Sequence, residues 1–246
     1  MSKIDGSVVF VTGANRGIGR AFVEEFLAAG ADKVYAGARN TDSLSDLVDY
    51  GAGKVVPVEV DVTKPETIEA AAAAGKDVTI LVNNAGVAGF QALVSASDGN
   101  SARGEMETNF FGTLNMVRSF APALANNGGG AIANISSIAA YVNFPALGSY
   151  SASKAAVHSL TQGIRSELAK QGTLVVGVYP GPVDTDLAAD VPMDKISPNE
   201  VAKNVLNAIE DGTEDVFPDP VSTEMREALL ADPKAVERQA GEMMPA

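Results

Sequence analysis

The first forty residues place a strand, a glycine-containing turn and a helix in immediate succession. An apolar run at 7–12 leads into Thr12-Gly13-Ala14-Asn15-Arg16-Gly17-Ile18-Gly19, and the apolar face of a helix follows with Phe22, Val23, Phe26 and Leu27. Glycines permit a tight turn and a close approach of the backbone, and a helix N-terminus offers unpaired N–H groups to a pyrophosphate. The spacing is Gly-x-x-x-Gly-x-Gly rather than Gly-x-Gly-x-x-Gly, so an ordinary tight βα turn also fits this stretch.

The same alternation of short apolar strands and helical segments continues along the chain. Further strands are predicted at 33–38, 55–60, 78–82, 131–136 and 174–179, with helical patterns between them. Strands that alternate with helices predict a parallel sheet with helices packed on it. No repeat or linker divides the 246 residues, so we expect one α/β domain over 1–246, with a divergent tail at 215–246 that holds a short strand near 216–217 and charged helical segments.

Three helix patterns between and after these strands give sharper expectations. Thr63-Lys64-Pro65-Glu66 and Ser197-Pro198-Asn199-Glu200 both have the form of a capping box with proline near the first helical position. A long helical region from about Asp98 to Asn127 carries Asn109 in its middle.

Composition excludes several classes of function. The chain has no cysteine and one histidine, which leaves no disulfide framework and no Cys/His metal cluster, and argues against a zinc-type alcohol dehydrogenase. The formal net charge of -13 argues against non-specific binding to nucleic acid or to an anionic membrane. No apolar run approaches the ~20 residues of a membrane span, and the start lacks a signal-peptide pattern, so we expect a cytoplasmic protein.

The segment Ser149-Tyr150-Ser151-Ala152-Ser153-Lys154 has the spacing for proton-transfer chemistry. At the start of a helix, Tyr150 and Lys154 lie on one face because they are four residues apart. A lysine charge roughly 4 Å from the phenol, at an effective dielectric of about 20, favours the phenolate by about 4 kcal/mol. This would lower the tyrosine pKa by up to about three units. A solvated helix face explains the same spacing, so the pair needs support from elsewhere.

Polar residues and glycines follow several strands at the edge where open α/β sheets bind ligands. They are Asn83-Asn84-Ala85-Gly86, Ser136-Ser137 and Pro180-Gly181-Pro182-Val183-Asp184-Thr185. The two asparagines suit either a ligand or hydrogen bonds that join neighbouring strands.

Two arginines predict NADP(H) rather than NAD(H) as cofactor. Arg39 follows the second strand. In an NAD-specific fold the position just before it is usually an acidic residue, whereas here that position is Ala38. Arg16 lies within the glycine turn. Charge-assisted hydrogen bonds to a 2′-phosphate contribute roughly 1.5–3 kcal/mol each, so two of them favour NADPH by about a hundredfold or more. Solvated surface arginines are the alternative.

Taken together, these residues resemble the short-chain dehydrogenase/reductase family over the length to about residue 210. The matching motifs are Thr12-Gly13…Gly17-x-Gly19, Asp61-Val62, Asn83-Asn84-Ala85-Gly86, Asn109, Ser137, Tyr150-x-x-x-Lys154 and Pro180-Gly181…Thr185. The resemblance implies a single Rossmann-like, doubly wound parallel sheet of about seven strands with helices on both faces. It also implies an enzyme in which hydride passes between a nicotinamide and a carbonyl carbon.

The resemblance further implies a role for each matching residue. Tyr150 would exchange a proton with the substrate oxygen, Ser137 would hydrogen-bond that oxygen, Lys154 would lower the Tyr150 pKa and hold the nicotinamide ribose, and Asn109 would keep a water that relays protons to Lys154. The cofactor would be met by Gly13, Asn15, Arg16, Gly17, Ile18, Gly19, Arg39, Asp61, Val62, Asn83, Ala85, Gly86, Pro180, Gly181, Val183 and Thr185, together with Tyr150 and Lys154.

The chain departs from the family pattern in three places. The stretch between Asp61 and Asn83 is short, little room follows Thr185 for a substrate lid, and the tail lacks a glycine-rich ending. His158, on the same helical face as Lys154, is expected to be structural.

Three functions remain open: an NADPH-dependent carbonyl/alcohol oxidoreductase, which the full residue set favours, a non-catalytic dinucleotide-binding regulator, and an epimerase or isomerase on the same fold. Apolar residues after the Asn83 and Ser137 strands, among them Val87, Phe90, Tyr141, Val142 and Phe144, favour a neutral, hydrophobic substrate. The helix at 150–171 carries small residues that allow another helix to approach closely. We therefore predict a homodimer formed through this helix and the helix at 98–127, with a tetramer as the alternative.

Overall fold

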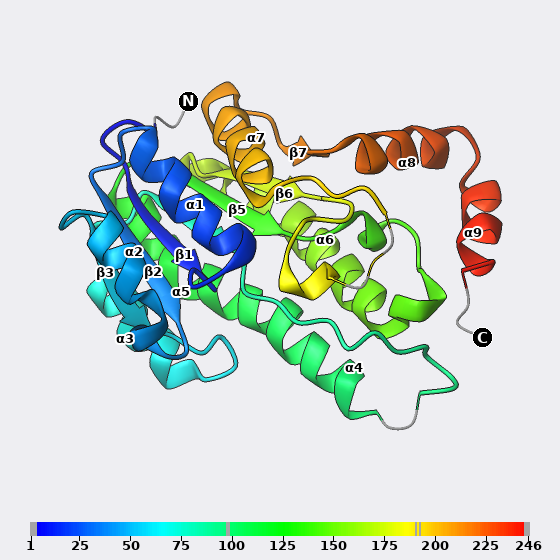
Figure 1. Cartoon of the computed structure of the whole chain (residues 1–246). Coiled ribbons are helices and arrows are strands. Elements are labelled where there is room, and N and C mark those ends of the chain that lie inside the picture. The colour runs from blue at the N-terminus through cyan, green and yellow to red at the C-terminus, as the bar shows by residue number, and fades with distance from the viewer. Residues whose placement is uncertain (1–3, 97–98, 190, 192, 244–246) are drawn as a thin grey trace.

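The computed structural model describes residues 4–96, 99–189, 191 and 193–243 of the chain. Its described strands form one parallel sheet of seven, in the order β3-β2-β1-β4-β5-β6-β7 (Figure 1). The strands are β1 Val8–Thr12, β2 Lys33–Ala38, β3 Val55–Glu59, β4 Ile80–Asn83, β5 Ala131–Ile135, β6 Leu174–Val178 and β7 Asp215–Val216. The predicted Rossmann-like α/β fold is confirmed.

Helices cover both faces of the sheet (Figure 1). They are α1 Gly17–Ala28, α2 Ser45–Tyr50, α3 Pro65–Ala74, α4 Asn100–Glu105, α5 Thr113–Asn126, α6 Gly148–Leu168, α7 Pro198–Asp211, α8 Pro220–Ala231 and α9 Pro233–Gly241. None of the helices that the structure describes is both long enough and hydrophobic enough to cross a lipid bilayer.

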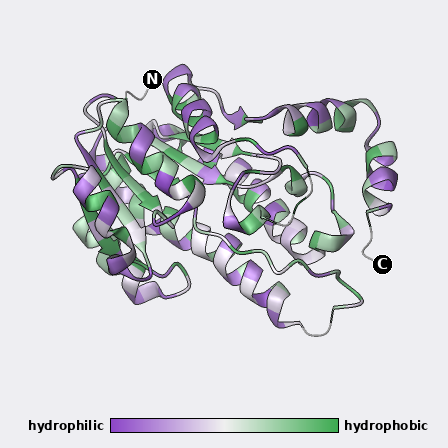
Figure 2. Cartoon of the chain, viewed as in Figure 1, coloured by the Kyte–Doolittle hydropathy of each residue, from purple (hydrophilic) through white to green (hydrophobic). Residues whose placement is uncertain are grey.

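Alternate strand residues feed two separate cores, one on each face of the sheet. Val9 and Val11 of β1 pack with α1 and α7 on one face, whereas Phe10 between them packs with α3, α5 and α6 on the other. Side chains of a strand alternate between its two faces, so strands buried on both sides are hydrophobic throughout. Figure 2 shows the sheet in the hydrophobic colour, enclosed by helices with hydrophilic outer surfaces.

The strand order reverses direction between β1 and β4, which lie side by side although β2 and β3 separate them in the chain. In such sheets the connections from the two strands leave on opposite faces, and a crevice opens beyond their carboxyl ends. The glycine turn follows β1. The motif Asn83-Asn84-Ala85-Gly86 begins with the last residue of β4 and continues into the loop after it. The topology therefore places both predicted cofactor segments at the carboxyl ends of two neighbouring strands.

One of the two predicted capping boxes forms. Ser197 caps α7, where its hydroxyl accepts from the Glu200 N–H and the Glu200 side chain accepts from the Ser197 N–H. At α3 the prediction is wrong, because Lys64 occupies the N-cap position and makes no side-chain cap. The Thr63 hydroxyl instead donates to the Asp61 carboxylate at 2.7 Å.

The long helix is interrupted by a π-helical segment, Met106–Gly112, between α4 and α5. Its predicted start at Asp98 lies outside the described residues, and its predicted end at Asn127 agrees with α5 to one residue. A π segment often marks a functional site. Asn109 lies within it.

The tail forms β7, α8 and α9, which run away from the end of the sheet (Figure 1). Its helices have their own small core, in which Val236 and Ala240 pack with Val142, a residue from the segment between β5 and α6. The C-terminal elements thus pack against the segment that separates Ser137 from Tyr150.

Candidate active site

The predicted site residues lie beyond the carboxyl ends of β1 to β6, along one edge of the sheet. The glycine turn follows β1, Arg39 follows β2, Asp61 follows β3, Gly86 follows β4, Ser137 follows β5 and Pro180 follows β6. Since all six strands are parallel, this edge collects residues that are distant in the sequence.

The three glycine positions of the glycine turn disfavour a side chain. Gly13 and Gly17 have positive φ angles of 64° and 53°, a region that L-residues with side chains rarely adopt. A Cβ at Gly19 would lie 2.1 Å from the Gly13 carbonyl oxygen, and one at Gly17 would lie 3.1 Å from Thr185 Cγ2. These glycines are therefore required by the backbone itself.

The N-terminus of α1 is left without a side-chain cap. Arg16 occupies its N-cap position and makes no capping hydrogen bond. The first turn of a helix has backbone donors without intrahelical partners and the positive end of the helix dipole. A pyrophosphate would satisfy them, so the glycine turn and the start of α1 fit a bound dinucleotide.

The two asparagines after β4 join strands, as one of the two sequence interpretations stated. Asn84 Nδ2 donates to the carbonyl oxygens of Thr12 at 2.9 Å and Gly13 at 3.2 Å. Asn83 Nδ2 donates to Asn134 Oδ1 of β5 at 2.8 Å. The Thr12 hydroxyl also accepts the Ala85 N–H at 3.0 Å. These bonds hold the end of β4 against the glycine turn.

Asn109 is buried and fully engaged by neighbouring groups. Its side chain accepts the Val87 N–H at 2.9 Å and donates to the Val87 carbonyl at 2.9 Å and to the Ser153 hydroxyl at 2.9 Å. The Ser153 hydroxyl in turn donates to the Tyr150 carbonyl at 2.7 Å. Asn109 thus links the loop after β4 to the first turn of α6.

Tyr150, Ser137 and Lys154 come together as predicted. The Tyr150 and Ser137 hydroxyl groups are hydrogen-bonded to each other. Lys154 Nζ lies 5.6 Å from the centre of the Tyr150 ring and donates to the Ile135 carbonyl at 2.8 Å. A Cβ at Gly86 would lie 3.2 Å from Asn109 Oδ1 and 3.4 Å from Lys154 Nζ, so the loop after β4 passes close to both side chains.

The expected lowering of the Tyr150 pKa is not found. Burial raises the pKa of Tyr150 to about 12; the Ser137 hydrogen bond acts in the opposite direction, and the Glu105 charge adds to the rise. Burial also lowers the pKa of Lys154 to about 8. The lysine points to the Ile135 carbonyl rather than to the phenol oxygen, so its charge does not offset the loss of solvent around the tyrosine.

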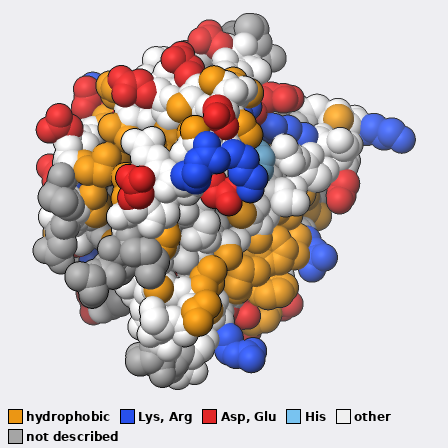
Figure 3. Space-filling view, turned by 90° about the vertical axis from the view of Figure 1, so that its right-hand side faces the viewer, with side chains coloured by type: hydrophobic (Ala, Val, Ile, Leu, Met, Phe, Trp, Pro, Cys, Tyr) orange, Lys and Arg blue, Asp and Glu red, His pale blue; other side chains and the backbone are white. Residues whose placement is uncertain are grey.

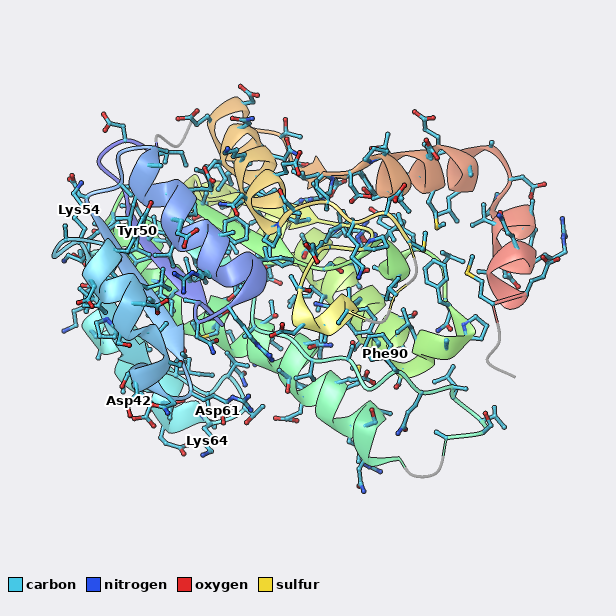
Figure 4. The ribbon with its side chains drawn as sticks, viewed as in Figure 1. Asp42, Tyr50, Lys54, Asp61, Lys64 and Phe90 are labelled. Carbon is cyan, nitrogen blue, oxygen red and sulfur yellow. The ribbon has the colours of Figure 1, made fainter. Side chains whose placement is uncertain are left out.

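A group of charges lies beyond β2 and β3. Asp61 and Lys64 are neighbours at this edge (Figure 4), and Arg39 is exposed. Burial raises the pKa of Asp61, but the hydrogen bonds from Thr63 and the charges of Lys64 and Arg39 lower it more, and the net pKa is lowered. Lys64 is a cation that the sequence interpretation did not assign to the site.

Arg16 has a partner in the loop after β6. Its Nη1 lies 2.9 Å from Asp186 Oδ2, and both side chains are largely exposed. Val183 forms a β-bridge with Ile196, which closes the base of this loop. The loop therefore lies against the glycine turn, and Arg16 stands where both meet.

His158 belongs to an aromatic cluster, in agreement with the structural role expected for it. Its Nδ1 lies 2.7 Å from the Tyr179 hydroxyl, and the rings of Tyr141 and Phe217 pack against Tyr179. The Arg226 guanidinium of α8 lies 5.0 Å from the Tyr141 ring centre. Burial lowers the pKa of His158.

Exposed hydrophobic side chains gather near the site. Figure 3 shows them over the lower part of the face that lies to the right in Figure 1. In the loop after β4, Phe90 is 50% exposed, Leu93 60% and Val94 99%. Phe111, within the π segment, is 43% exposed. The small residues Ala152 and Ala155 of α6 are also exposed.

Sequence reasoning missed two buried acidic residues beside these segments. Glu105 accepts the Gly89 N–H at 2.6 Å and its charge acts on Tyr150. Asp219 accepts the Gly181 N–H at 2.8 Å. Asp219-Pro220 has the pattern of an N-cap followed by proline, which could have indicated the helix start but not the contact with Gly181.

A family model described as short chain dehydrogenase matches residues 7–195. A short chain dehydrogenase of Monascus purpureus is 35% identical over 204 residues, which cover 78% of this chain and 70% of that protein. An uncharacterized oxidoreductase of Staphylococcus saprophyticus is 34% identical over 221 residues, 85% of this chain and 94% of the relative.

Solved structures agree over almost the whole chain. A short chain dehydrogenase from Burkholderia cenocepacia in complex with NADP has 45% identity and a TM-score of 0.93, with 99% of this chain and 100% of that chain covered. A short chain dehydrogenase/reductase from Burkholderia phymatum in complex with NAD has 26% identity and a TM-score of 0.85, with 96% of each chain covered.

Proposed function

The chain belongs to the short-chain dehydrogenase/reductase family and is an oxidoreductase, and on this basis we propose that it uses NADP(H) to interconvert a carbonyl compound and an alcohol. The observation that carries the proposal is the hydrogen-bonded pair of Tyr150 and Ser137 beside Lys154, at the same sheet edge as the uncapped start of α1. A protein that only sensed a dinucleotide would have no use for this group of proton-handling residues.

The site residues divide the work between binding and proton transfer. The bound nicotinamide supplies or accepts the hydride. The backbone of the glycine turn and of α1 would hold the pyrophosphate, and Lys154 would hold the nicotinamide ribose. Ser137 would hydrogen-bond the substrate oxygen and Tyr150 would pass its proton to that oxygen during reduction, so that charge on it is neutralised as it develops.

The raised pKa of Tyr150 fits an acid role. At neutral pH the phenol is protonated, because burial raises its pKa to about 12. A proton donor must hold its proton until negative charge develops on the acceptor. For alcohol oxidation the same group must first lose that proton, and the positive charge of Lys154 would favour this when it is directed to the phenol.

Arg39 supports the choice of NADP(H). It is exposed at the end of β2, and its charge acts on Asp61 together with that of Lys64. Both cations are available to a 2′-phosphate at the end of β2, and a guanidinium can bind a phosphate through two hydrogen bonds. The NADP-bound structure from Burkholderia cenocepacia, at 45% identity, supports the same choice.

The substrate is proposed to be neutral and hydrophobic. Phe90, in the loop after β4, is 50% exposed and supports the proposal. Val142 and Phe144 pack with the tail helices, and Tyr141 packs with Tyr179 and Phe217, so these three residues do not add to it. We further propose that the protein is a homodimer through the faces of α4 to α6, since exposed Phe111 and the small α6 residues lie there. Light scattering at micromolar concentration would measure the state.

The test is NADPH consumption with a panel of aryl ketones, aliphatic aldehydes and anionic keto acids, in the parent and in Tyr150→Phe. We expect turnover with the neutral compounds, and a loss of about a thousandfold or more in Tyr150→Phe with unchanged NADPH binding. Comparable turnover in Tyr150→Phe, or no turnover with any carbonyl compound, would reject the function. Racemisation or epimerisation without net NADPH use would instead identify an isomerase.

The cofactor arm compares NADPH with NADH in the parent and in Ala38→Asp/Arg39→Leu. The parent should prefer NADPH by about a hundredfold, and the double variant should lose most of this preference because a carboxylate replaces the cation near the 2′-phosphate. A parent that prefers NADH would show the assignment of Arg39 to be wrong while leaving the reaction type standing.

A further inference from the structure

Asp219 of the C-terminal tail makes more contacts than a helix cap needs. It occupies the N-cap position of α8 and is 5% exposed. Its Oδ1 accepts the Ser222 N–H at 2.8 Å, as a cap does. Its Oδ2 accepts the Ser222 hydroxyl at 2.9 Å and the Gly181 N–H at 2.8 Å. One carboxylate therefore joins the start of α8 to the loop that follows β6.

The bond to Gly181 orients a single peptide group that also faces the proposed catalytic serine. The carbonyl of the same peptide, that of Pro180, accepts the Ile138 N–H at 3.0 Å and the Ser137 hydroxyl at 3.4 Å. A peptide unit is planar, so its N–H and C=O point in opposite directions and turn together. Asp219 on one side thus determines where the carbonyl points on the other.

The packing around this peptide leaves little freedom. A Cβ at Gly181 would lie 2.7 Å from Asp219 Oδ1 and 3.2 Å from Val221 Cβ, so the carboxylate can approach only because residue 181 is glycine. Prolines on both sides, Pro180 and Pro182, restrict the backbone further. The Asp219 side chain is buried and accepts three hydrogen bonds, from the Gly181 N–H and from the Ser222 N–H and hydroxyl.

The serine hydroxyl has competing partners. Ser137 donates to Pro180 at 3.4 Å, accepts the Ala139 N–H at 3.1 Å and is hydrogen-bonded to Tyr150. The bond to Pro180 is long, so the hydroxyl can leave it for a substrate oxygen at little cost. The shorter contact of this carbonyl, with the Ile138 N–H at 3.0 Å, holds the backbone next to the serine.

We propose that Asp219 is a positioning residue for the reaction: by holding the Pro180–Gly181 peptide, whose carbonyl accepts the Ile138 N–H, it fixes the backbone next to Ser137 and so keeps the Ser137 side chain beside Tyr150. This inference rests on the proposed function of Ser137 and Tyr150. It gives the tail at 215–246 a part in catalysis, because the residue that orients the serine comes from the start of α8.

The first test compares Asp219→Asn with a matched control, Asp232→Asn. Asp232 caps α9, where its Oδ1 accepts the Lys234 and Ala235 N–H groups at 3.1 and 3.0 Å. Each change turns a cap carboxylate in the tail into an amide, but only Asp219 contacts Gly181. An amide has one acceptor oxygen and cannot serve both Ser222 and Gly181. We expect kcat to fall about tenfold or more in Asp219→Asn, with KM for NADPH and the kinetics of Asp232→Asn close to the parent.

The second test is a double-mutant cycle with Ser137→Ala. If Asp219 acts through the serine, Asp219→Asn should reduce kcat in the parent but add little in the Ser137→Ala background, because residues that act as a unit are not additive. A purely structural role would give equal losses in both backgrounds. Equal losses, or a kcat in Asp219→Asn that matches Asp232→Asn, would overturn the inference.

Amide hydrogen exchange at Gly181 gives a readout that needs no substrate. Exchange should be faster in Asp219→Asn than in the parent and unchanged in Asp232→Asn, and unchanged exchange in Asp219→Asn would also contradict the inference.

If Asp219→Asn does not fold, Gly181→Ala replaces it, since the added Cβ would displace the carboxylate and should give the same loss of kcat. If the parent itself has no Tyr150-dependent activity, the proposed function fails and the inference with it. An active parent with additive losses overturns the inference alone.

Discussion

Helices α1 and α7 pack on the same face of the sheet, yet their first turns are built differently. α7 begins with Ser197 and Glu200 in a reciprocal capping box and Pro198 next to the cap. α1 begins with Arg16, which caps nothing, and with glycines where side chains would collide. The donors at the start of α7 are used by its own side chains, whereas α1 has no such side-chain cap. We expect the first helix start to stabilise the fold and the second to bind the cofactor.

The largest expected effect comes from filling the turn before α1. Gly19→Ala would place a Cβ 2.1 Å from the Gly13 carbonyl oxygen, so the turn must shift away from the position that suits a pyrophosphate. Calorimetric binding should show NADPH affinity lower by about a hundredfold or more. Gly163→Ala is the control, because no atom lies within 4 Å of the added Cβ. Equal affinities in the two variants would show that the turn does not determine binding.

The next largest effect is the pH dependence of NADPH binding, which distinguishes the contribution of the backbone N–H donors from that of Lys154. Helix N–H groups do not titrate, but the pKa of Lys154 is about 8, so its charge is present at pH 7 and mostly lost at pH 9. If the ammonium holds the cofactor ribose, NADPH should bind up to about tenfold more weakly at pH 9 than at pH 7. Lys154→Met should bind weakly with little pH dependence over that range, and a parent with flat binding would remove Lys154 from the cofactor site.

A smaller effect is expected from giving α1 the cap it lacks. Arg16 has extended backbone angles, φ -159° and ψ 171°, which suit an N-cap residue. Arg16→Ser and Arg16→Ala both remove the guanidinium, but only serine can bond the first-turn donors. The serine variant should be more stable to urea than the alanine variant by about 1 kcal/mol and bind NADPH about fivefold more weakly. Indistinguishable variants would mean that α1 has no donors to compete for.

The smallest functional effect is expected at α7. Ser197→Ala removes the side chain that accepts the Glu200 N–H and should lower the free energy of unfolding by about 1 kcal/mol. Its kcat and its KM for NADPH should equal those of the parent, since this cap contacts no proposed site residue. A loss of cofactor affinity comparable with that of Arg16→Ser would break the distinction between the two helix starts.

The sheet and the residues at its edge could be predicted because both follow from local patterns. β2 at 33–38 and the capping box at Ser197 appear as expected, since apolar runs and caps are read within a few residues. The failed box at Thr63 shows the limit: the Asp61 carboxylate took the threonine hydroxyl, and nothing in the four-residue pattern indicates that competitor.

The rest of the site depended on contacts between distant parts of the chain. Burial is the largest influence on the pKa of Tyr150, whereas the sequence shows only the lysine four residues away. Asp219 lies 38 residues from Gly181 along the chain, and no spacing rule connects an N-cap in a tail with the loop after β6. The positions of acidic residues relative to the site were therefore outside the reach of sequence patterns.

The π segment at Met106–Gly112 also limits how the chain length can change. A π turn amounts to one extra residue within an α-helix, and each residue of an α-helix turns the chain by about 100°. Deleting one residue between 106 and 112 would rotate α4 by about a quarter turn relative to α5, and Glu105 would leave Gly89. Insertions or deletions should therefore be rejected in this helix but accepted in the exposed loop around Val94, which is 99% exposed.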